Sequence, residues 1–266
     1  MSESQWTRGV TSMSKQTTAD ILYLLQRGTI ELEGLLPWSS NYTFLIRICG
    51  QPADTYAGEV QAVYKPRRGE RPLWDFAQGT LCQRERAAFL VSQALGWSLV
   101  PPTVIRKGPH GQGSIQLFVE HDPERHYFTL EGDATHQRQL QQIALLDVVI
   151  NNADRKGGHV LLEASGETNG SERLWAIDHG ICFHTEHKLR TVIWEFAGQL
   201  IPGDLLADLV RLKEQFCGET QTLTTQLKDL LTGAEVAALQ KRLERLIKQG
   251  RFLSPGPGRH YPWPPV

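Results

Sequence analysis

The sequence predicts an α+β fold, with an antiparallel sheet in its N-terminal half and mainly helices in its C-terminal half. Three apolar stretches with strand character, 30–33, 42–48 and 59–65, follow one another within about forty residues, with turn-forming residues between them. Residues 136–150 and 233–248 instead carry apolar side chains at helical spacing. A chain of 266 residues fits two small lobes or one large domain with a sizeable core.

Two helices accompany the predicted strands. Residues 18–28 form the first, with Thr18 as its N-cap and Gly28 at its end. The second covers residues 80–95 and begins at Thr80, where Thr-x-x-Gln resembles a capping box.

Glu85 lies on the apolar face of the 80–95 helix, one turn from Leu81 and Phe89. A carboxylate that faces inward needs a partner. Lys65, which ends the third strand, is the candidate. Alternatively, the two residues are not paired: Lys65 is an ordinary solvated lysine, and Glu85 is a polar residue that the helix tolerates. The basic loop 66–71 that follows is either a solvated turn or a contact for phosphate or an acidic substrate.

Two further strands and one helix complete the predicted elements. Residues 99–106 form an extended edge strand, because prolines disfavour a central position, and residues 114–120 form the fifth strand. Residues 204–216 carry leucines at helical spacing. The Pro/Gly-rich tail 254–266 is not helical, and it is either disordered or lies over the body through Tyr261 and Trp263.

The polar segment after the 136–150 helix contains candidate catalytic and metal-binding residues. His159 begins a short apolar strand, Asp154 lies five residues before it, and Asp178 ends the next short strand at 174–177. Phosphoryl transfer needs a carboxylate near the attacking hydroxyl and ligands that hold a metal ion on the nucleotide phosphates. The alternative is that both polar segments are ordinary turns.

This ordered set resembles the phosphatidylinositol 3-/4-kinase-like branch of the kinase superfamily. There the catalytic loop reads D-R-x-x-x-N, and a D-x-G follows the next strand; here the chain has Asp154-Arg155, His159 and Asp178-His179-Gly180. It is most similar to small bacterial members, whose relatives include HipA-like protein kinases. The resemblance extends from about Ile30 to about Ile201.

The resemblance implies a two-lobed protein-kinase-like fold. Residues 1–17 would be a flexible N-terminus, 18–121 the N-lobe, 122–253 the C-lobe and 254–266 a tail. Residues 181–195 would correspond to the activation segment, which faces the acceptor in kinases.

The resemblance also implies roles for the catalytic and metal-binding residues. Asp154 would orient or deprotonate the acceptor hydroxyl, and Lys65, held by Glu85, would bind the phosphates. His159 and Asp178 would hold the metal ion. Because His replaces Asn at 159 and Mg²⁺ prefers oxygen ligands, Mn²⁺ would tolerate this site better.

The nucleotide would lie between a turn and a hinge. The turn places Ser39, Ser40 and Asn41 over the phosphates, with an ordinary hairpin turn as the alternative. The hinge would present its backbone to the adenine ring through Phe118, Val119, Glu120 and His121.

These expectations describe an ATP-dependent kinase that uses Mg²⁺ or Mn²⁺ and phosphorylates a hydroxyl group. A protein or small-molecule acceptor is favoured over a phosphoinositide, since the sequence has no lipid-binding accessory domain or apolar membrane face. Two alternatives stay open: a nucleotide-binding pseudokinase that acts as a scaffold, and transfer of AMP on the same fold.

The composition limits the classes of binding partner and the cellular compartment that we expect for this protein. A net charge of −1 gives no general argument for binding nucleic acid or a membrane, and the apolar runs are too short to span a bilayer. The polar N-terminal segment does not resemble a signal peptide. Four scattered cysteines favour reduced thiols in the cytoplasm, and the spacing of Cys182, His184 and His187 does not match a closed zinc site.

Overall fold

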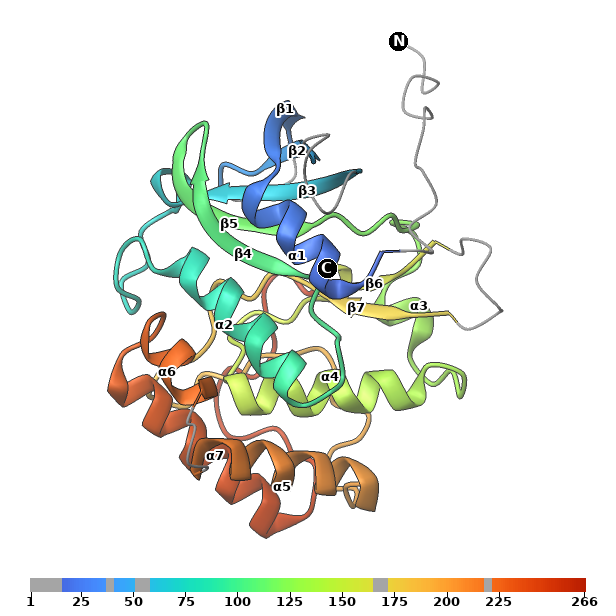
Figure 1. Cartoon of the computed structure of the whole chain (residues 1–266). Coiled ribbons are helices and arrows are strands. Elements are labelled where there is room, and N and C mark those ends of the chain that lie inside the picture. The colour runs from blue at the N-terminus through green and yellow to red at the C-terminus, as the bar shows by residue number, and fades with distance from the viewer. Residues whose placement is uncertain (1–15, 37–40, 51–57, 165–171, 218–221) are drawn as a thin grey trace.

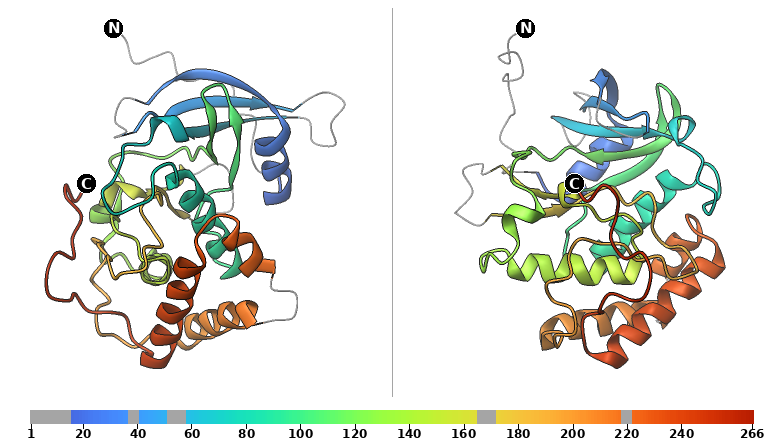
Figure 2. Two further views of the ribbon diagram at one scale, coloured as in Figure 1. Left: turned by 90° about the vertical axis from the view of Figure 1, so that its left-hand side faces the viewer. Right: turned by 180° about the vertical axis from the view of Figure 1, so that it is seen from behind.

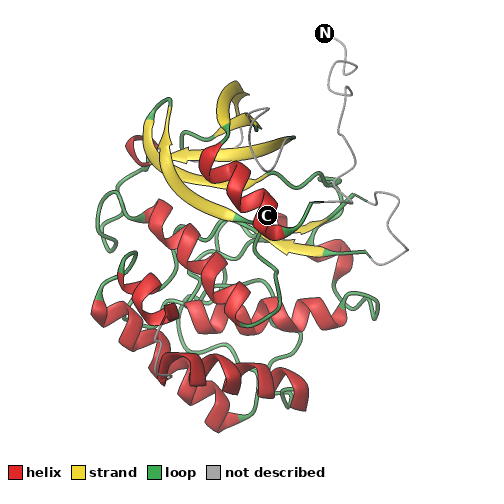
Figure 3. Ribbon diagram, viewed as in Figure 1, coloured by secondary structure: helices red, strands yellow, loops and turns green. Residues whose placement is uncertain are grey.

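A five-stranded antiparallel sheet forms the upper part of the molecule and most helices lie below it, as the computed structural model shows (Figure 1; Figure 3). The structure describes residues 16–36, 41–50, 58–164, 172–217 and 222–266. The first fifteen residues of the predicted flexible N-terminus lie outside the described residues, and so do Ser39 and Ser40. The predicted two-lobed α+β fold is confirmed.

The sheet has the order β1-β2-β3-β5-β4, and every neighbouring pair is antiparallel. Its strands are β1 (Thr29–Leu35), β2 (Phe44–Cys49), β3 (Glu59–Pro66), β4 (Thr103–Gly108) and β5 (Gly111–Leu117). The edge position of β4 agrees with the prediction, and Pro101 and Pro102 lie just before the strand rather than within it.

Alternation along the strands gives the sheet two different faces. One face packs its buried side chains, among them Ile46 and Tyr64, against α1 (Thr18–Arg27). The other face carries Val63 and Lys65 of β3 and is turned toward the C-lobe, because the Lys65 side chain contacts residues there. The side-chain alternation of β3 therefore determines that Lys65 reaches the cleft.

The two N-lobe helices begin differently from the sequence prediction. Thr17, not Thr18, caps α1, in a reciprocal capping box with Asp20. Thr80 precedes α2 (Leu81–Ala94) but does not cap it, and its hydroxyl donates to the carbonyl of Ala77 instead. The Glu70 carboxylate takes over this role, since it accepts from the first two backbone N–H groups of α2.

Helix α2 packs on the C-lobe as well as on the sheet. Its buried side chains belong to the same apolar cluster as those of the C-lobe helices. Arg84 extends from α2 to the carbonyl of Cys182 and to Glu235, with both contacts at 2.6 Å. A buried guanidinium thus anchors this helix to the C-lobe.

The C-lobe contains five helices within the described residues: α3 (Tyr127–Leu130), α4 (Gln137–Ile150), α5 (Gly203–Cys217), α6 (Thr222–Lys228) and α7 (Gly233–Gln249). The predicted helices at 136–150, 204–216 and 233–248 are confirmed. A small antiparallel pair, β6 (Val160–Leu162) and β7 (Leu174–Ala176), lies between the lobes. No helix among the described residues is long and apolar enough to cross a membrane.

The tail runs back over the C-lobe toward the cleft (Figure 2, right). Two of its carbonyls accept backbone N–H groups from the body: His260 from Thr191, and Pro265 from Gly157 at 2.7 Å. Of the two arrangements left open by the sequence, the tail adopts the ordered one. The His260 ring also packs edge-on against Trp194, whereas the predicted anchors Tyr261 and Trp263 are 48% and 77% exposed.

Candidate active site

Lys65 lies between two carboxylates from different parts of the chain. Its ammonium is 2.5 Å from Glu85 Oε1 and 2.9 Å from Asp178 Oδ1. Burial by itself lowers the pKa of Lys65, but the charges of Asp178 and Glu85 outweigh burial and raise the pKa above its ordinary range. The lysine is therefore a fixed cation, and the expected contact with Glu85 is present.

Glu85 connects α2 to the segment that carries Asp178. While one oxygen accepts from Lys65, the other accepts the backbone N–H of His179 at 3.0 Å. Its side chain is almost fully buried, so both oxygens need these partners. Glu85 thus positions the lysine and the Asp178-His179 backbone together.

Asp178 adopts a left-handed backbone conformation, with a φ of 60°, two residues after the end of β7. Aspartate tolerates this region better than most residues. The nearby Lys65 ammonium, aided by His159, holds the pKa of Asp178 well below its usual range although burial opposes this. Asp178 is therefore an anion, and its side chain remains 46% exposed toward the cleft.

A buried ion pair holds the loop that carries Asp154. Arg155 and Asp147 are both fully buried, and the guanidinium donates to both carboxylate oxygens. The same guanidinium donates to the carbonyls of His159 and Ile177, which lie next to β6 and β7. One arginine therefore fixes the loop, both short strands and α4 relative to one another.

Sequence reasoning gave no role to Asp147 or Arg155. An acidic residue among the apolar side chains of the 136–150 segment was the available signal, because a buried carboxylate needs a partner, as argued for Glu85.

His179 takes the position of the aromatic residue in the kinase D-F-G sequence. Its Nε2 accepts from Arg155 Nη2 at 2.6 Å, because a guanidinium can only donate. Burial, together with the positive charge of Arg155, holds the pKa of His179 well below its ordinary value. A neutral imidazole at this position thus completes the hydrogen bonding of the buried arginine.

Asp154 lies in the cleft with a partly screened carboxylate. Its backbone N–H donates to Asn152 Oδ1, and Lys156 Nζ is 3.7 Å from Asp154 Oδ2. Burial raises the pKa of Asp154 to about 6, with Lys156 opposing the shift and Asp178 adding to it. Such a carboxylate gains and loses its proton close to neutral pH, which suits a general base.

His159 presents a free ring nitrogen to Asp178. Its Nδ1 lies 3.0 Å from the carbonyl oxygen of Asp154 and 3.5 Å from the backbone nitrogen of Lys156. A carbonyl only accepts, so the shorter of the two contacts places the proton on Nδ1. The lone pair is then on Nε2, which is 3.4 Å from Asp178 Oδ2. Burial lowers the pKa of His159 to about 4, so the ring is neutral.

A neutral imidazole and a carboxylate fit a divalent cation, with the nitrogen favouring Mn²⁺ over Mg²⁺. The backbone contact at Nδ1 resembles the outer hydrogen bonds that orient metal-binding histidines. Within the described ranges, no three His, Cys, Asp or Glu side chains gather to hold a metal by themselves. These two residues would therefore share the ion with nucleotide phosphates, as is usual for Mg²⁺ sites.

A pocket of about 230 Å³ brings part of the predicted site together, while His159 and the four predicted hinge residues do not line it. Its lining includes Lys65, Glu85, Asp154, Asp178 and Asn41. The Asn41 side-chain oxygen accepts the backbone N–H of Arg71, so Asn41 is bonded to the basic loop 66–71. That Asn41 lies over the phosphates stays a prediction.

The predicted hinge lies between β5 and β6. The Phe118 N–H donates to the carbonyl of Gln61 in β3. The Val119 carbonyl lies 2.8 Å from His121 Nδ1, and the Glu120 carbonyl accepts the N–H of Ala164. Two hinge carbonyls are thus already engaged within the protein. The binding of adenine by these four residues stays a prediction.

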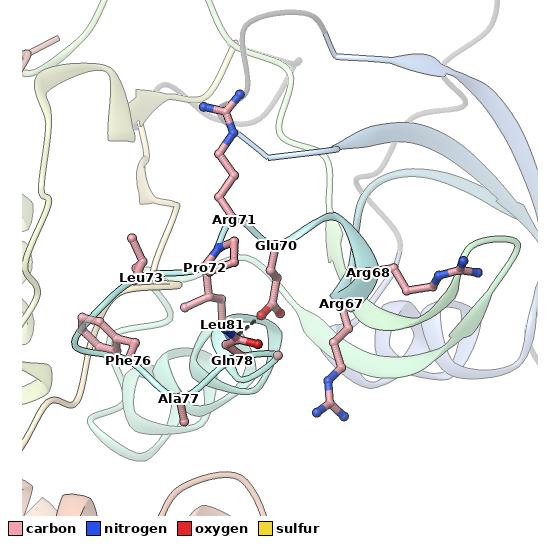
Figure 4. Close-up of a pocket in the computed structure, with 11 residues that line it drawn as sticks. Arg67, Arg68, Glu70, Arg71, Pro72, Leu73, Phe76, Ala77, Gln78 and Leu81 are labelled. Atoms are coloured by element: carbon pink, nitrogen blue, oxygen red, sulfur yellow. Dashed lines mark hydrogen bonds between the residues drawn. The ribbon is translucent and has the colours of Figure 1, made fainter.

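A second pocket, of about 330 Å³, adjoins the first and shares Glu70, Arg71, Leu73 and Leu81 with it (Figure 4). The Glu70 side chain points toward the start of α2, while the guanidinium groups of Arg67, Arg68 and Arg71 point in different directions (Figure 4). The basic loop therefore lines this pocket without forming a convergent anion site.

The comparisons with known proteins concern the family and the fold. The family model of phosphatidylinositol 3- and 4-kinases matches residues 104–233. Protein Rv2133c of Mycobacterium tuberculosis (strain ATCC 25618 / H37Rv) is 37% identical over 274 residues, which cover 91% of this chain and 94% of the relative. The matched range begins in β4, so Lys65 and Glu85 lie outside the family model.

Two solved kinases share the fold. The Golgi casein kinase with Mn/ADP bound has a TM-score of 0.52 and 16% identity, covering 87% of this chain and 75% of that chain. The Helicobacter pylori proinflammatory kinase CtkA has a TM-score of 0.53 and 10% identity, covering 86% of this chain and 94% of that chain. At these identities the similarity concerns the fold alone. The predicted relation to HipA-like kinases stays a prediction.

Proposed function

Because the chain belongs to the phosphatidylinositol 3-/4-kinase-like family, we propose that it is an ATP-dependent phosphotransferase. It transfers the γ-phosphoryl group to a hydroxyl of a protein or small-molecule acceptor. The main support for this proposal is that Lys65 contacts both Glu85 and Asp178. These three residues line one pocket together with Asp154.

The nucleotide phosphates bind at Lys65. The ammonium is held from one side by Glu85, which is itself fixed to the backbone of His179. A cation fixed in this way attracts phosphate oxygens without having to reorganise during the reaction. Lys65 thus binds the phosphates and neutralises part of their negative charge, which is the first contribution of the protein to the reaction.

Asp154 acts on the acceptor. In its ionised form it accepts a hydrogen bond from the acceptor hydroxyl, orients the oxygen for in-line attack and takes its proton as the bond to phosphorus forms. A pKa of about 6 leaves the carboxylate ionised at neutral pH and able to receive a proton.

His159 and Asp178 would hold the divalent cation together with the phosphates. When bound, Mg²⁺ or Mn²⁺ supplies positive charge to the phosphate oxygens on which negative charge develops. The contribution of the chain is to keep the imidazole neutral, with Nε2 free, and the Asp178 carboxylate ionised.

Incubation with ATP labelled on either the γ- or the α-phosphate tests the proposal. We expect label to leave γ-labelled ATP in the presence of Mn²⁺ or Mg²⁺ and to remain with the nucleotide when the α-phosphate is labelled. Lys65→Ala is the matched inactive variant. Transfer from the α-position would instead establish AMP transfer, and nucleotide binding without turnover on protein or small-molecule acceptors would establish a pseudokinase.

A further inference from the structure

The loop between β3 and α2 exposes arginines beside the proposed active site. Arg67, Arg68 and Arg71 are exposed, and among the described residues no carboxylate forms an ion pair with them. The two acidic residues of the loop have other partners: Glu70 accepts from the first N–H groups of α2, and Asp75 lies 2.8 Å from a lysine. The loop therefore carries unpaired positive charge, although the net charge of the whole chain is −1.

The guanidinium groups of these arginines diverge (Figure 4). A Cβ atom at Gly79 would meet the Arg67 guanidinium, and one at Gly111, where β5 begins, would meet the stem of Arg68. Arg71 lines the active-site pocket as well as the second one. Groups that point apart do not surround one phosphate, but each of them can bind a separate carboxylate along an extended chain.

The same loop also exposes apolar side chains. Trp74 is 93% exposed, and the Lys188 ammonium lies 5.0 Å from the centre of its ring. Leu73 is half-buried and lines both pockets. An exposed tryptophan offers a large apolar area to a partner that covers it, and tryptophans of this kind are frequent at the centre of binding interfaces.

This loop is attached to the segment 181–195, which corresponds to the acceptor-facing activation segment of kinases. Lys188 holds Asp75 at 2.8 Å, and the Phe76 ring packs edge-on against His184 at 5.3 Å between ring centres. The loop therefore lies on the side of the cleft from which an acceptor is expected to enter. We define the docking surface by five residues: Arg67, Arg68, Arg71, Leu73 and Trp74.

We propose that the docking surface binds an acidic segment of a protein acceptor, an inference that rests on the proposed function. Carboxylates of the acceptor pair with the arginines, and an apolar side chain of the acceptor covers Trp74. The hydroxyl to be phosphorylated then lies at Asp154, because the active-site pocket adjoins the second pocket. A small-molecule acceptor at Asp154 would leave the docking surface uncovered, and a hollow with divergent arginines does not match the flat surface of a membrane.

Two fluorescent peptides test the inference when their binding to the full chain is measured by anisotropy without nucleotide. One peptide contains a serine, a leucine and several glutamates, and in the other glutamine replaces every glutamate. We expect the wild type to bind the glutamate peptide more tightly by about threefold or more, since several exposed charge pairs add up to that factor. The difference should decrease as the salt concentration increases.

Substitutions separate the charged part of the docking surface from the apolar part. Arg67→Gln combined with Arg68→Gln should weaken binding of the glutamate peptide by about threefold or more and leave the glutamine peptide unaffected. Both arginines line only the second pocket, so the affinity for ATP should not change. Trp74→Ala should weaken the binding of both peptides, because both contain the leucine.

The matched control is Lys241→Gln combined with Lys248→Gln, which removes the same charge from exposed positions on α7 and should bind both peptides like the wild type. Thermal unfolding of each variant establishes that it is folded. Equal affinity of the wild type for the two peptides, or unchanged binding in the folded double arginine variant, would overturn the inference. So would capture of the wild type by phosphatidylserine vesicles without a preference for the glutamate peptide.

The same glutamate peptide distinguishes this inference from the proposed function. We expect label from γ-labelled ATP to reach its serine in the presence of Mn²⁺. Selective binding of the glutamate peptide without transfer of label to any acceptor would overturn the phosphotransferase and leave the docking surface. Transfer of label to both peptides with equal efficiency and equal affinity would support the phosphotransferase and overturn the docking surface.

Discussion

The carboxylate of Asp154 has a pKa near 6 because it is buried, and this makes the proposed base sensitive to pH in an accessible range. A base works only in its deprotonated form. Turnover should therefore rise as the pH increases through about 6 and level off above it. A pH profile of kcat/KM for the acceptor would show this rise, and a profile that is flat between pH 5 and 7 would remove Asp154 from the role of base.

Asp154→Asn keeps the shape of the side chain and loses its charge. We expect kcat to fall by about 10²–10⁴ with little change in the KM for ATP, since the interaction matters mainly in the transition state. Steady-state kinetics with ATP as the varied substrate measure both constants. Wild-type turnover in this variant would mean that the catalytic loop has been assigned to the wrong residues.

The imidazole of His159 distinguishes this site from the usual kinase pattern. His159→Asn replaces the Nε2 lone pair that faces Asp178 with a side chain that can offer oxygen. We expect the preference for Mn²⁺ over Mg²⁺ to decrease, because Mg²⁺ favours oxygen ligands. Turnover measured against a concentration series of each metal gives the ratio. The metal role of His159 would be lost if the ratio did not change.

Among the elements, α2 depends on contacts that are distant in sequence. Glu85→Gln should lower turnover because the amide cannot match the charge of Lys65, and its NH₂ group cannot accept the N–H of His179. Nucleotide binding should weaken as well, with the fold retained. Gln83→Glu, at a half-buried position on the same helix, is a control for changing an acid–amide pair at α2. Full activity of Glu85→Gln would reduce Glu85 to a tolerated polar residue.

The elements that were predictable from the sequence are those in which the pattern of apolar and polar residues extends over many positions. β3 and α7 end within about two residues of their predicted limits, since many residues contribute to each periodicity. α3 has four residues and was not predicted, because it is too short for a helical period. The start of α2 was predicted at the wrong cap, as Glu70 reaches it from the preceding loop.

The candidate site was predictable to the extent that its residues stand beside strand ends. Lys65 and Asp178 stand at the ends of short apolar runs, and Asp154 lies in the polar segment between the 136–150 helix and the next strand; all three line one pocket. The network beneath them was not predictable in the same way. Arg155 donates to two carbonyls that lie next to different strands, and a backbone acceptor cannot be recognised from the residue type.

At the scale of the whole molecule, the Asp147–Arg155 pair is the support on which the loop and both short strands depend. Asp147→Ala would leave a charged guanidinium buried without its counter-ion. We expect the free energy of unfolding to fall by about 3–5 kcal/mol. Denaturant unfolding monitored by circular dichroism measures this change.

Asp204→Ala is the matched control, because it removes the partner of Arg138 from an exposed pair. Its loss should cost no more than about 1 kcal/mol. Equal effects of the two substitutions would show that the buried pair contributes no more than a surface contact.

The anchoring of α2 by Arg84 bears on how such an enzyme can be regulated. Kinases that are switched on and off by displacing the corresponding helix separate the lysine from its glutamate in the inactive form. Here the residue beside that glutamate is bonded to the Cys182 carbonyl and to Glu235 of α7, so displacement would break a buried ion pair as well. The Lys65–Glu85 contact should accordingly persist as long as Arg84 keeps its contacts with the Cys182 carbonyl and Glu235.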